Sequence, residues 1–246
     1  MNTIHKDKII CWFSCGAASA VATYLALKTY GHEKTDVIRI DTGSEHPDNE
    51  RFANDCESWF NQPIRLVKSN IYSSVTDVIA KKHFINSPFG AACTYELKKR
   101  VRYLIEDEYK SWKGQVFGFD NSETLRAKRF SEQYPDTKPL FPLITSNLSK
   151  SDCLGILKMQ GIEIPQMYKL GYSNNNCIGC VKGGKGYWNA IRNDFPQQFD
   201  EMARLERVIG HSCIKNMYLD ELPVDIGRRK SLLPECSIFC ALEFIN

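Results

Sequence analysis

Cysteine thiols are the side chains of this chain best suited to chemistry, and their spacing exceeds what a packed core requires. Cys177 and Cys180 form a C-x-x-C pair, and Cys93 stands far upstream of them. Thiolates are soft ligands that favour iron–sulfur clusters or zinc, whereas histidine is scarce here, with five in total. A C-x-x-C pair joined by a distant third thiolate therefore predicts a metal site that holds an iron–sulfur cluster or zinc.

Two more cysteines, Cys236 and Cys240, lie near the C-terminus and leave several roles open. Either thiolate could be the fourth metal ligand, or the last iron of a cluster could stay open for a small ligand such as sulfide. The Cys236 thiolate could instead attack a sulfur atom, if the cations of Arg228-Arg229-Lys230 lower its pKa, or it could simply pack among apolar neighbours. The remaining cysteines are predicted to be small buried hydrophobes: Cys11, Cys15, Cys56, Cys153 and Cys213.

A run of small residues at 14–19, Ser-Cys-Gly-Ala-Ala-Ser, follows an apolar stretch at 9–13 that is typical of a buried strand. Apolar residues at 20–30 then predict a helix. Ligands of parallel sheets bind at such strand ends, where helix N–H groups and the hydroxyls of Ser14 and Ser19 could hold phosphate or sulfate. Neither G-x-G-x-x-G nor G-K-[ST] is present, so a turn without any ligand stays open.

Strand and helix patterns alternate along the chain in the way that builds a parallel sheet covered on both faces. They predict strands at 9–13, 37–40, 64–67 and 115–118, and helices at 20–30, 47–60, 95–109, 149–159 and 196–209. The predicted fold class is α/β, with a doubly wound, mostly parallel sheet. We expect one domain over residues 1–246, in which residues 170–246 form a cysteine-rich C-terminal segment.

Length and composition are those of an ordinary soluble protein: 246 residues, 43% hydrophobic and 25% charged. No apolar run approaches the length that spans a bilayer, which predicts no membrane association, and the N-terminus shows no signal-peptide pattern. We therefore expect a cytoplasmic protein whose ten cysteines are reduced thiols. A net charge of +3 is too small to indicate nucleic-acid binding by itself.

An ordered set of segments resembles the sulfonucleotide reductases (PAPS and APS reductases) of the PP-loop, or adenine nucleotide α-hydrolase-like, superfamily. Residues 14–19 resemble the S-G-G-x-x-S loop of that superfamily, and Asp41-Thr42-Gly43 resembles the D-T-G of the reductase branch. Further matches follow in the same order over most of the chain: Gly118 through Glu123 to Arg126, Pro142-Leu143-Ile144, Ile164-Pro165, Gly171-Tyr172, Cys177-Ile178-Gly179-Cys180 and Glu235-Cys236-Ser237-Ile238-Phe239.

The resemblance implies that the chain binds an adenine nucleotide. Asp41 and Glu45 could also be an acid/base pair. The resemblance implies the simpler interpretation, in which the Asp41-Thr42-Gly43 turn binds adenine or ribose. Phosphate or sulfate is assigned to Lys98, Arg126 and Arg129, two of which lie in family-matching segments. The complete predicted nucleotide site consists of Ser14, Cys15, Gly16, Ser19, Asp41, Thr42, Gly43, Lys98, Glu123, Arg126 and Arg129.

Three departures from the family pattern bear on the chemistry. Ala17 and Ala18 stand where ATP-cleaving members often have Lys and Asp, and Ala92 stands where cluster-bearing APS reductases have the first of two adjacent cysteines. Phe239 replaces a histidine of the terminal motif. The resemblance favours a [4Fe-4S] cluster over zinc, with Cys236 as the nucleophile. The predicted ligands are Cys93, Cys177, Cys180 and, in place of the cysteine missing at Ala92, Cys240.

The predicted function is that of a sulfonucleotide reductase-like enzyme, which releases sulfite from PAPS or APS through a thiosulfonate on Cys236. Its expected partners are the adenine sulfonucleotide and a thioredoxin- or glutaredoxin-like reductant. One alternative is an iron–sulfur-dependent sulfurtransferase that thiolates tRNA or DNA, and another is a non-catalytic nucleotide- or nucleic-acid-binding module with a structural metal. A homodimer, and the choice among PAPS, APS and ATP, stay open.

Overall fold

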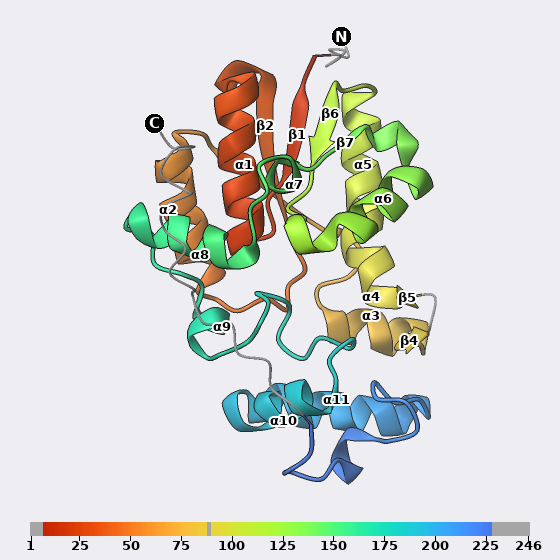
Figure 1. The fold of residues 1–246 in the computed structure, drawn as a ribbon. Helices are drawn as coiled ribbons and strands as arrows, with labels where there is room; N and C mark the ends of the chain where they lie inside the picture. The colour runs from red at the N-terminus through yellow and green to blue at the C-terminus, as the bar shows by residue number, and fades with distance from the viewer. Residues whose placement is uncertain (1–6, 88–89, 228–246) are drawn as a thin grey trace.

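A five-stranded parallel sheet forms the centre of the molecule (Figure 1). The computed structural model describes residues 7–87 and 90–227. The strand order across the sheet is β3-β2-β1-β6-β7, and every neighbouring pair runs parallel. The strands are β1 (Ile9–Trp12), β2 (Thr35–Asp41), β3 (Ile64–Lys68), β6 (Gly114–Val116) and β7 (Pro139–Leu140). The predicted α/β class with a doubly wound sheet is confirmed.

Helices cover both faces of this sheet because its strands are apolar on both sides. Ile9 and Cys11 of β1 pack with the helices of one face, whereas Ile10 packs with Ile105 and Tyr109 of the other. The first face carries α1 (Ala17–Tyr30), α2 (Asn49–Phe60), α7 (Pro142–Thr145) and α8 (Lys150–Met159). The other side of the sheet in Figure 1 carries α5 (Arg100–Tyr109) and α6 (Thr124–Gln133).

The chain reverses its direction of travel across the sheet between β1 and β6. It runs outward from β1 through β2 to β3, and then returns to the other side of β1 with β6 and β7. Ile9 lies in register with both Thr35 and Gly114, so β1 is the central strand at this switch. Ligands of doubly wound sheets bind outside the carboxyl ends of the strands at such a switch point. The fold therefore places the 14–19 turn where a ligand site is expected.

A second hydrophobic core lies beyond the carboxyl ends of the strands. Trp188, Ile191 and Met202 of two C-terminal helices pack there with Val78 and Ile79, so residues after 170 share a core with α3. In Figure 1 these helices form a separate layer below the sheet. The elements of this region are α3 (Val75–Lys82), β4 (Asn86–Ser87), β5 (Gly90–Ala91), α4 (Ala92–Thr94), the π-helical turn Tyr95–Lys99, α9 (Gln166–Lys169), α10 (Lys185–Asp194) and α11 (Pro196–Ile209).

The element boundaries differ from the sequence predictions in several places. Helix α1 begins at Ala17, inside the segment expected to be a turn, and Cys93 lies within α4 instead of preceding a helix. Short 3-10 turns complete the described chain at His32–Lys34, Asn121–Glu123, Pro135–Thr137 and Leu219–Glu221. None of the helices in residues 7–87 and 90–227 is both long and apolar enough to cross a membrane.

Candidate functional site

The turn after β1 is built around the hydroxyl of Ser19. This oxygen accepts hydrogen bonds from the backbone N–H groups of Ser14 (3.1 Å) and Gly16 (3.2 Å), and from the Ser14 hydroxyl (3.1 Å). It donates in turn to the Gly16 carbonyl at 2.9 Å. Cys15 takes up a left-handed conformation with φ of 54°, and its thiol is buried. The N–H groups of Ser14 and Gly16 are therefore used to hold the turn together.

Tyr168 supplies a hydroxyl to the first turn of α1. Its oxygen accepts a hydrogen bond from the backbone N–H of Ala17 at 3.3 Å. Burial raises the pKa of Tyr168 to about 12, so the phenol is neutral at physiological pH. Because anions favour exposed N–H groups at helix starts, a phosphate would have to bind beside this hydroxyl or displace it.

A cavity of about 380 Å³ opens beside this turn, at the carboxyl ends of β1 and β6. Of the predicted nucleotide residues, six line it: Ser14, Gly16, Ser19, Lys98, Glu123 and Arg126. Lys150, Tyr168 and Asn175 form part of its wall as well, and the sequence analysis assigned no role to any of them. Arg129 does not line the cavity, and neither does the turn of residues 41–43.

Cationic side chains stand on different walls of this cavity. Arg126, in the first turn of α6, forms an ion pair with Glu123, the last residue of the preceding 3-10 turn. Lys98 is exposed on the π-helical turn. The ammonium of Lys150 donates to the Ser173 carbonyl and the Asn174 side chain, and burial lowers the pKa of Lys150. Within the described residues, neither lysine forms an ion pair with a carboxylate. The cavity thus offers two ammonium groups that an anionic ligand could neutralise.

Gly118, just past the end of β6, makes the close approach that shapes the cavity floor. A Cβ atom at this position would lie 2.7 Å from both the nitrogen and the Cα of Ser19. Such contacts do not occur in real structures, so a larger residue would force β6 away from the start of α1. A glycine is therefore required where the strand end meets the turn.

A smaller, more apolar cavity of about 210 Å³ adjoins the first and shares Trp12, Ser14, Lys98 and Phe117 with it. Ile38 and Ile40 of β2 form part of its floor. The cations Lys98, Lys99 and Arg102 line it beside these apolar side chains, and a nucleobase can occupy an apolar surface that carries a few polar groups. The pair of cavities could accommodate the two halves of a nucleotide, a base and its anionic groups.

The predicted Asp41-Thr42-Gly43 turn lies against the cysteines instead. Burial alone would raise the pKa of Asp41, but its bonds to Lys68 (2.7 Å) and to the Gly43 N–H (2.8 Å) lower it overall. The Thr42 hydroxyl lies 3.0 Å from Cys177 Sγ. This turn therefore supports the cysteine site, and a role in adenine or ribose binding stays a prediction.

A buried network of polar side chains connects the segment after β2 with the turn after β1. Arg39, 5% exposed, lies 3.5 Å from the Glu45 carboxylate, which also accepts a hydrogen bond from Asn49 (3.1 Å). Asn175 donates to the Asn49 side chain at 2.7 Å and to the Cys15 carbonyl. Burial raises the pKa of Glu45 although Asn49, Lys98 and Arg39 all act in the other direction. The network fixes the wall at Asn175 against the turn after β1.

The C-x-x-C pair sits on a tight turn at the edge of the second core. The Tyr187 hydroxyl accepts the Cys180 N–H at 2.8 Å and donates to the Cys177 carbonyl at 3.0 Å. Burial raises the pKa of Cys177 to about 11, although Lys98 opposes the shift, and burial also raises the pKa of Cys93. In the described parts of the chain, no three His, Cys, Asp or Glu side chains are close enough together to enclose a metal ion.

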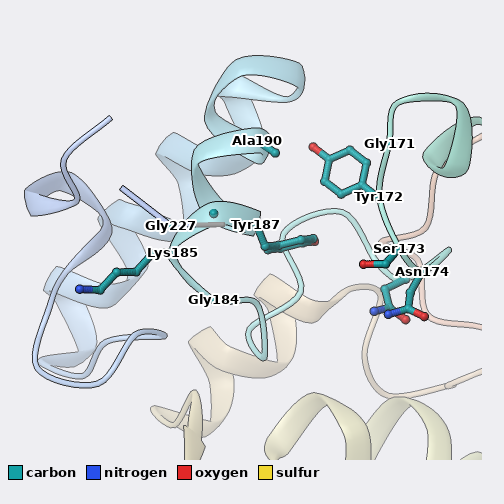
Figure 2. Close-up of a pocket in the computed structure, with 11 residues that line it drawn as sticks. Gly171, Tyr172, Ser173, Asn174, Gly184, Lys185, Tyr187, Ala190 and Gly227 are labelled. Atoms are coloured by element: carbon teal, nitrogen blue, oxygen red, sulfur yellow. The ribbon is translucent and has the colours of Figure 1, made fainter. Parts of the chain in front are cut away.

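A further cavity of about 410 Å³ lies on the other side of Tyr187 (Figure 2). The rings of Tyr187 and Tyr172 meet edge to face, with centroids 5.7 Å apart, and Tyr172 donates to Asp194 at 2.8 Å. Lys185 also lines this cavity, but Figure 2 shows its side chain pointing away from the two tyrosines. Tyr172 therefore packs against Tyr187, whose hydroxyl holds the cysteine turn.

The other predicted cysteines divide into two groups. Those expected to be core residues are buried: Cys11, Cys15, Cys56, Cys153 and Cys213. Burial also raises the pKa of each of these thiols. Cys236 and Cys240 lie outside the described residues, so their predicted roles stay predictions.

Comparisons with known proteins agree with this architecture. No protein-family model matches the sequence, and no similar curated protein was found. Among solved structures, the crystal structure of phosphoadenylyl-sulfate (PAPS) reductase from Candida auris, in a phosphate complex, matches with a TM-score of 0.51. The match has 15% sequence identity and covers 69% of this chain and 81% of that chain. At this identity the likeness concerns the fold: the chain has an α/β fold similar to that of a PAPS reductase.

Proposed function

We propose that this chain is a sulfonucleotide reductase-like enzyme that binds an adenine sulfonucleotide at the carboxyl ends of β1 and β6. The observation that carries the proposal is the cavity that Lys98 and Lys150 line together with the small-residue turn; among the described residues neither lysine forms an ion pair, although Asp120 and Glu123 also line the cavity. Ammonium groups of this kind suit phosphate and sulfate, and the adjoining apolar cavity suits a base. The similarity to the PAPS reductase fold supports the same assignment.

The proposed cofactor is a [4Fe-4S] cluster on Cys93, Cys177 and Cys180. The donor set fits such a group chemically, since all three side chains are free thiols and soft ligands. When bound, the cluster would supply a polarisable charge close to Lys98, which lines the nucleotide cavity and acts on the pKa of both Cys93 and Cys177. Zinc is the alternative metal for the same ligands.

The proposed reaction proceeds through Cys236. Its thiolate attacks the sulfate sulfur of the nucleotide, so that an S–S bond forms, the S–O bond to the phosphate breaks and the nucleotide leaves. A thiolate of a thioredoxin- or glutaredoxin-like dithiol then attacks the Cys236 sulfur, and sulfite leaves with the electron pair. The second thiol closes a disulfide in the reductant and returns Cys236 to its reduced state.

Sulfite release by anaerobically purified protein tests the proposal. Protein with a dithiol reductant should release sulfite from PAPS or APS but not from a mixture without the sulfonucleotide. Cys236→Ser should abolish the release and retain nucleotide affinity, whereas Cys153→Ala, at a buried thiol of α8, should retain both. A wild type that binds neither sulfonucleotide by calorimetry and releases no sulfite would show that the reductase proposal is wrong.

A further inference from the structure

We infer that Cys213 is the fourth thiolate of the cysteine site, together with Cys93, Cys177 and Cys180. The inference rests on the proposed metal and deepens it, because it names a ligand for which the sequence offered only Cys236 or Cys240. Cys213 has no C-x-x-C spacing and follows α11 in an apolar context, which is why the sequence indicates a core residue. Its position in the fold points to a different role.

Asn86 ties three cysteine-bearing segments together. Its side-chain amide donates to the carbonyl of Val181 at 2.8 Å and to the carbonyl of Cys213 at 3.2 Å. Because a single nitrogen holds both oxygens, the backbone next to Cys180 and the backbone at Cys213 are adjacent. Asn86 itself pairs across the β4–β5 hairpin with Ala91, two residues before Cys93. The hairpin, the C-x-x-C turn and the loop after α11 therefore converge on one amide.

The loop that carries Cys213 is anchored by a buried carboxylate. Glu206 of α11 is fully buried, and it accepts hydrogen bonds from the backbone N–H groups of Cys213 (2.5 Å) and Leu219 (2.6 Å). His211 adds a contact of 2.9 Å between its Nε2 and the carbonyl of Asn86. A loop fastened at both ends holds its thiol in a defined place, as a metal ligand requires.

The thiols also lie within electrostatic range of one another. Burial is the main reason why the pKa of Cys213 is raised, with Glu206 next, but Cys180 and Cys93 raise it further. Cys180 likewise raises the pKa of Cys93 and of Cys177. These electrostatic contributions agree with the backbone contacts at Asn86, which carry the inference.

The chemistry of the four donors fits one metal site, although the site is not closed in the structure. Four thiols without histidine match the ligand sets of [4Fe-4S] clusters and of structural zinc. Since no three of the described side chains enclose an ion, binding requires the thiols to turn inward around the metal. Four protein thiolates would also leave no iron open for sulfide, which favours the reductase over the sulfurtransferase.

Metal content and ligand number test the inference without reference to activity. Wild type, Cys213→Ser and the matched control Cys153→Ser, which also replaces a buried thiol, are reconstituted anaerobically with iron and sulfide and separately with Co²⁺. Cys213→Ser should lose about tenfold or more in metal affinity in a chelator competition. Its Co²⁺ spectrum should show one thiolate fewer than that of the wild type. Cys153→Ser should match the wild type in both measurements.

Two further variants make the outcome decisive. Asn86→Ala leaves every thiol in place but removes the tie, so it should weaken metal binding if the three segments form the site. If Cys213→Ser does not fold, the metal affinity of Asn86→Ala tests the inference in its place. Cys240→Ser should keep its full metal content; loss of metal from this variant, with none from Cys213→Ser and Asn86→Ala, would overturn the inference.

The inference and the proposed function fail in different ways. A metal-loaded wild type whose affinity is unchanged in Cys213→Ser overturns the ligand assignment and leaves the reductase proposal standing. Absence of sulfite release, combined with loss of metal in Cys213→Ser, overturns the reductase and leaves the ligand assignment standing. A wild type that binds neither iron, cobalt nor zinc overturns the metal site itself.

Discussion

Lys98 and Lys150 are the two residues that we expect to contribute most to the proposed anion binding in the β1–β6 cavity. Lys98 is exposed, so water already stabilises its charge, whereas Lys150 is partly buried and its ammonium is held by the Ser173 carbonyl and the Asn174 side chain. Burial disfavours the charged form of Lys150, and an anion at the site would restore the balance. We therefore expect Lys150 to contribute more to nucleotide affinity than the exposed Lys98 does.

We predict that nucleotide affinity falls with rising pH through loss of the Lys150 proton. Because burial lowers the pKa of Lys150, the group loses its proton below the ordinary lysine value of 10.5, and the neutral amine no longer neutralises a phosphate. Calorimetry with AMP from pH 7 to 10 should show this fall in the wild type. Lys150→Arg keeps its charge over that range and should flatten the profile.

Lys150→Met should weaken AMP binding at pH 7 by about 10-fold to 100-fold, the effect of losing a hydrogen bond to a charged group. Lys158→Met removes an exposed lysine from the same helix and serves as the control, with unchanged affinity. A Lys150→Arg profile parallel to that of the wild type would assign the pH dependence to another group.

Sequence motifs mark some of the residues that line the cavity, whereas the fold alone brings in others. Ser14, Gly16 and Arg126 line the cavity, and a small-residue turn and a family-like segment mark them in the sequence, while their part in nucleotide binding stays a prediction. Lys150 and Tyr168 come from α8 and from just after the start of α9, where no spacing indicates a ligand. These two residues reach the cavity only because the fold brings α8 and α9 beside the turn after β1. That tertiary arrangement cannot be read from a single sequence.

At the scale of elements, the junction between β6 and α1 controls the shape of the cavity. The strand end approaches the turn so closely that only a hydrogen atom fits at Gly118. Gly155, in the interior of α8, is the opposite case, because a Cβ atom there would meet nothing within 4 Å. The two glycines therefore allow a matched pair of substitutions.

We predict opposite effects for the two alanine variants. Gly118→Ala should destabilise the protein by about 1–3 kcal/mol, since the added methyl group must push backbone away, and it should weaken nucleotide binding. Gly155→Ala should stabilise it by about 0.5–1 kcal/mol, because alanine loses less entropy in a helix interior. Denaturant unfolding measures both changes; equal stability of the two variants would show that the approach at Gly118 can relax freely.

Element patterns were predictable where apolar residues recur regularly and not where short or polar segments build the structure. The strands at 37–40 and 64–67 and the helix at 196–209 are confirmed, each within a few residues. Helix α10 was missed because its start, Gly183-Gly184-Lys185-Gly186, has the composition of a loop. Helix α6 was missed because Ala127 is its one buried residue, so no apolar face marks it.

At the scale of the whole molecule, two cores meet at the proposed metal site. The sheet and α1, α2 and α8 bury one set of side chains, whereas α3, α10 and α11 bury another. Cys93 and Cys177 pack on the second core, and Thr42, at the end of β2, contacts Cys177 from the sheet side. A metal at this place would fasten the second core more than the first, because each proposed thiolate belongs to it or to its edge.

We predict that metal removal loosens the second core selectively. Hydrogen exchange of metal-loaded and chelator-treated protein should show faster exchange in α3, α10 and α11 after treatment, while β1 and β2 keep their protection. The cause is loss of the thiolate bonds that join α4, the C-x-x-C turn and the loop after α11, since metal binding contributes directly to folding. Cys177→Ser is the control: without a complete site, it should exchange rapidly in these helices before treatment and change little afterwards. If chelation leaves the exchange of all these helices unchanged in the wild type, or loosens the sheet equally, the metal does not hold the second core together.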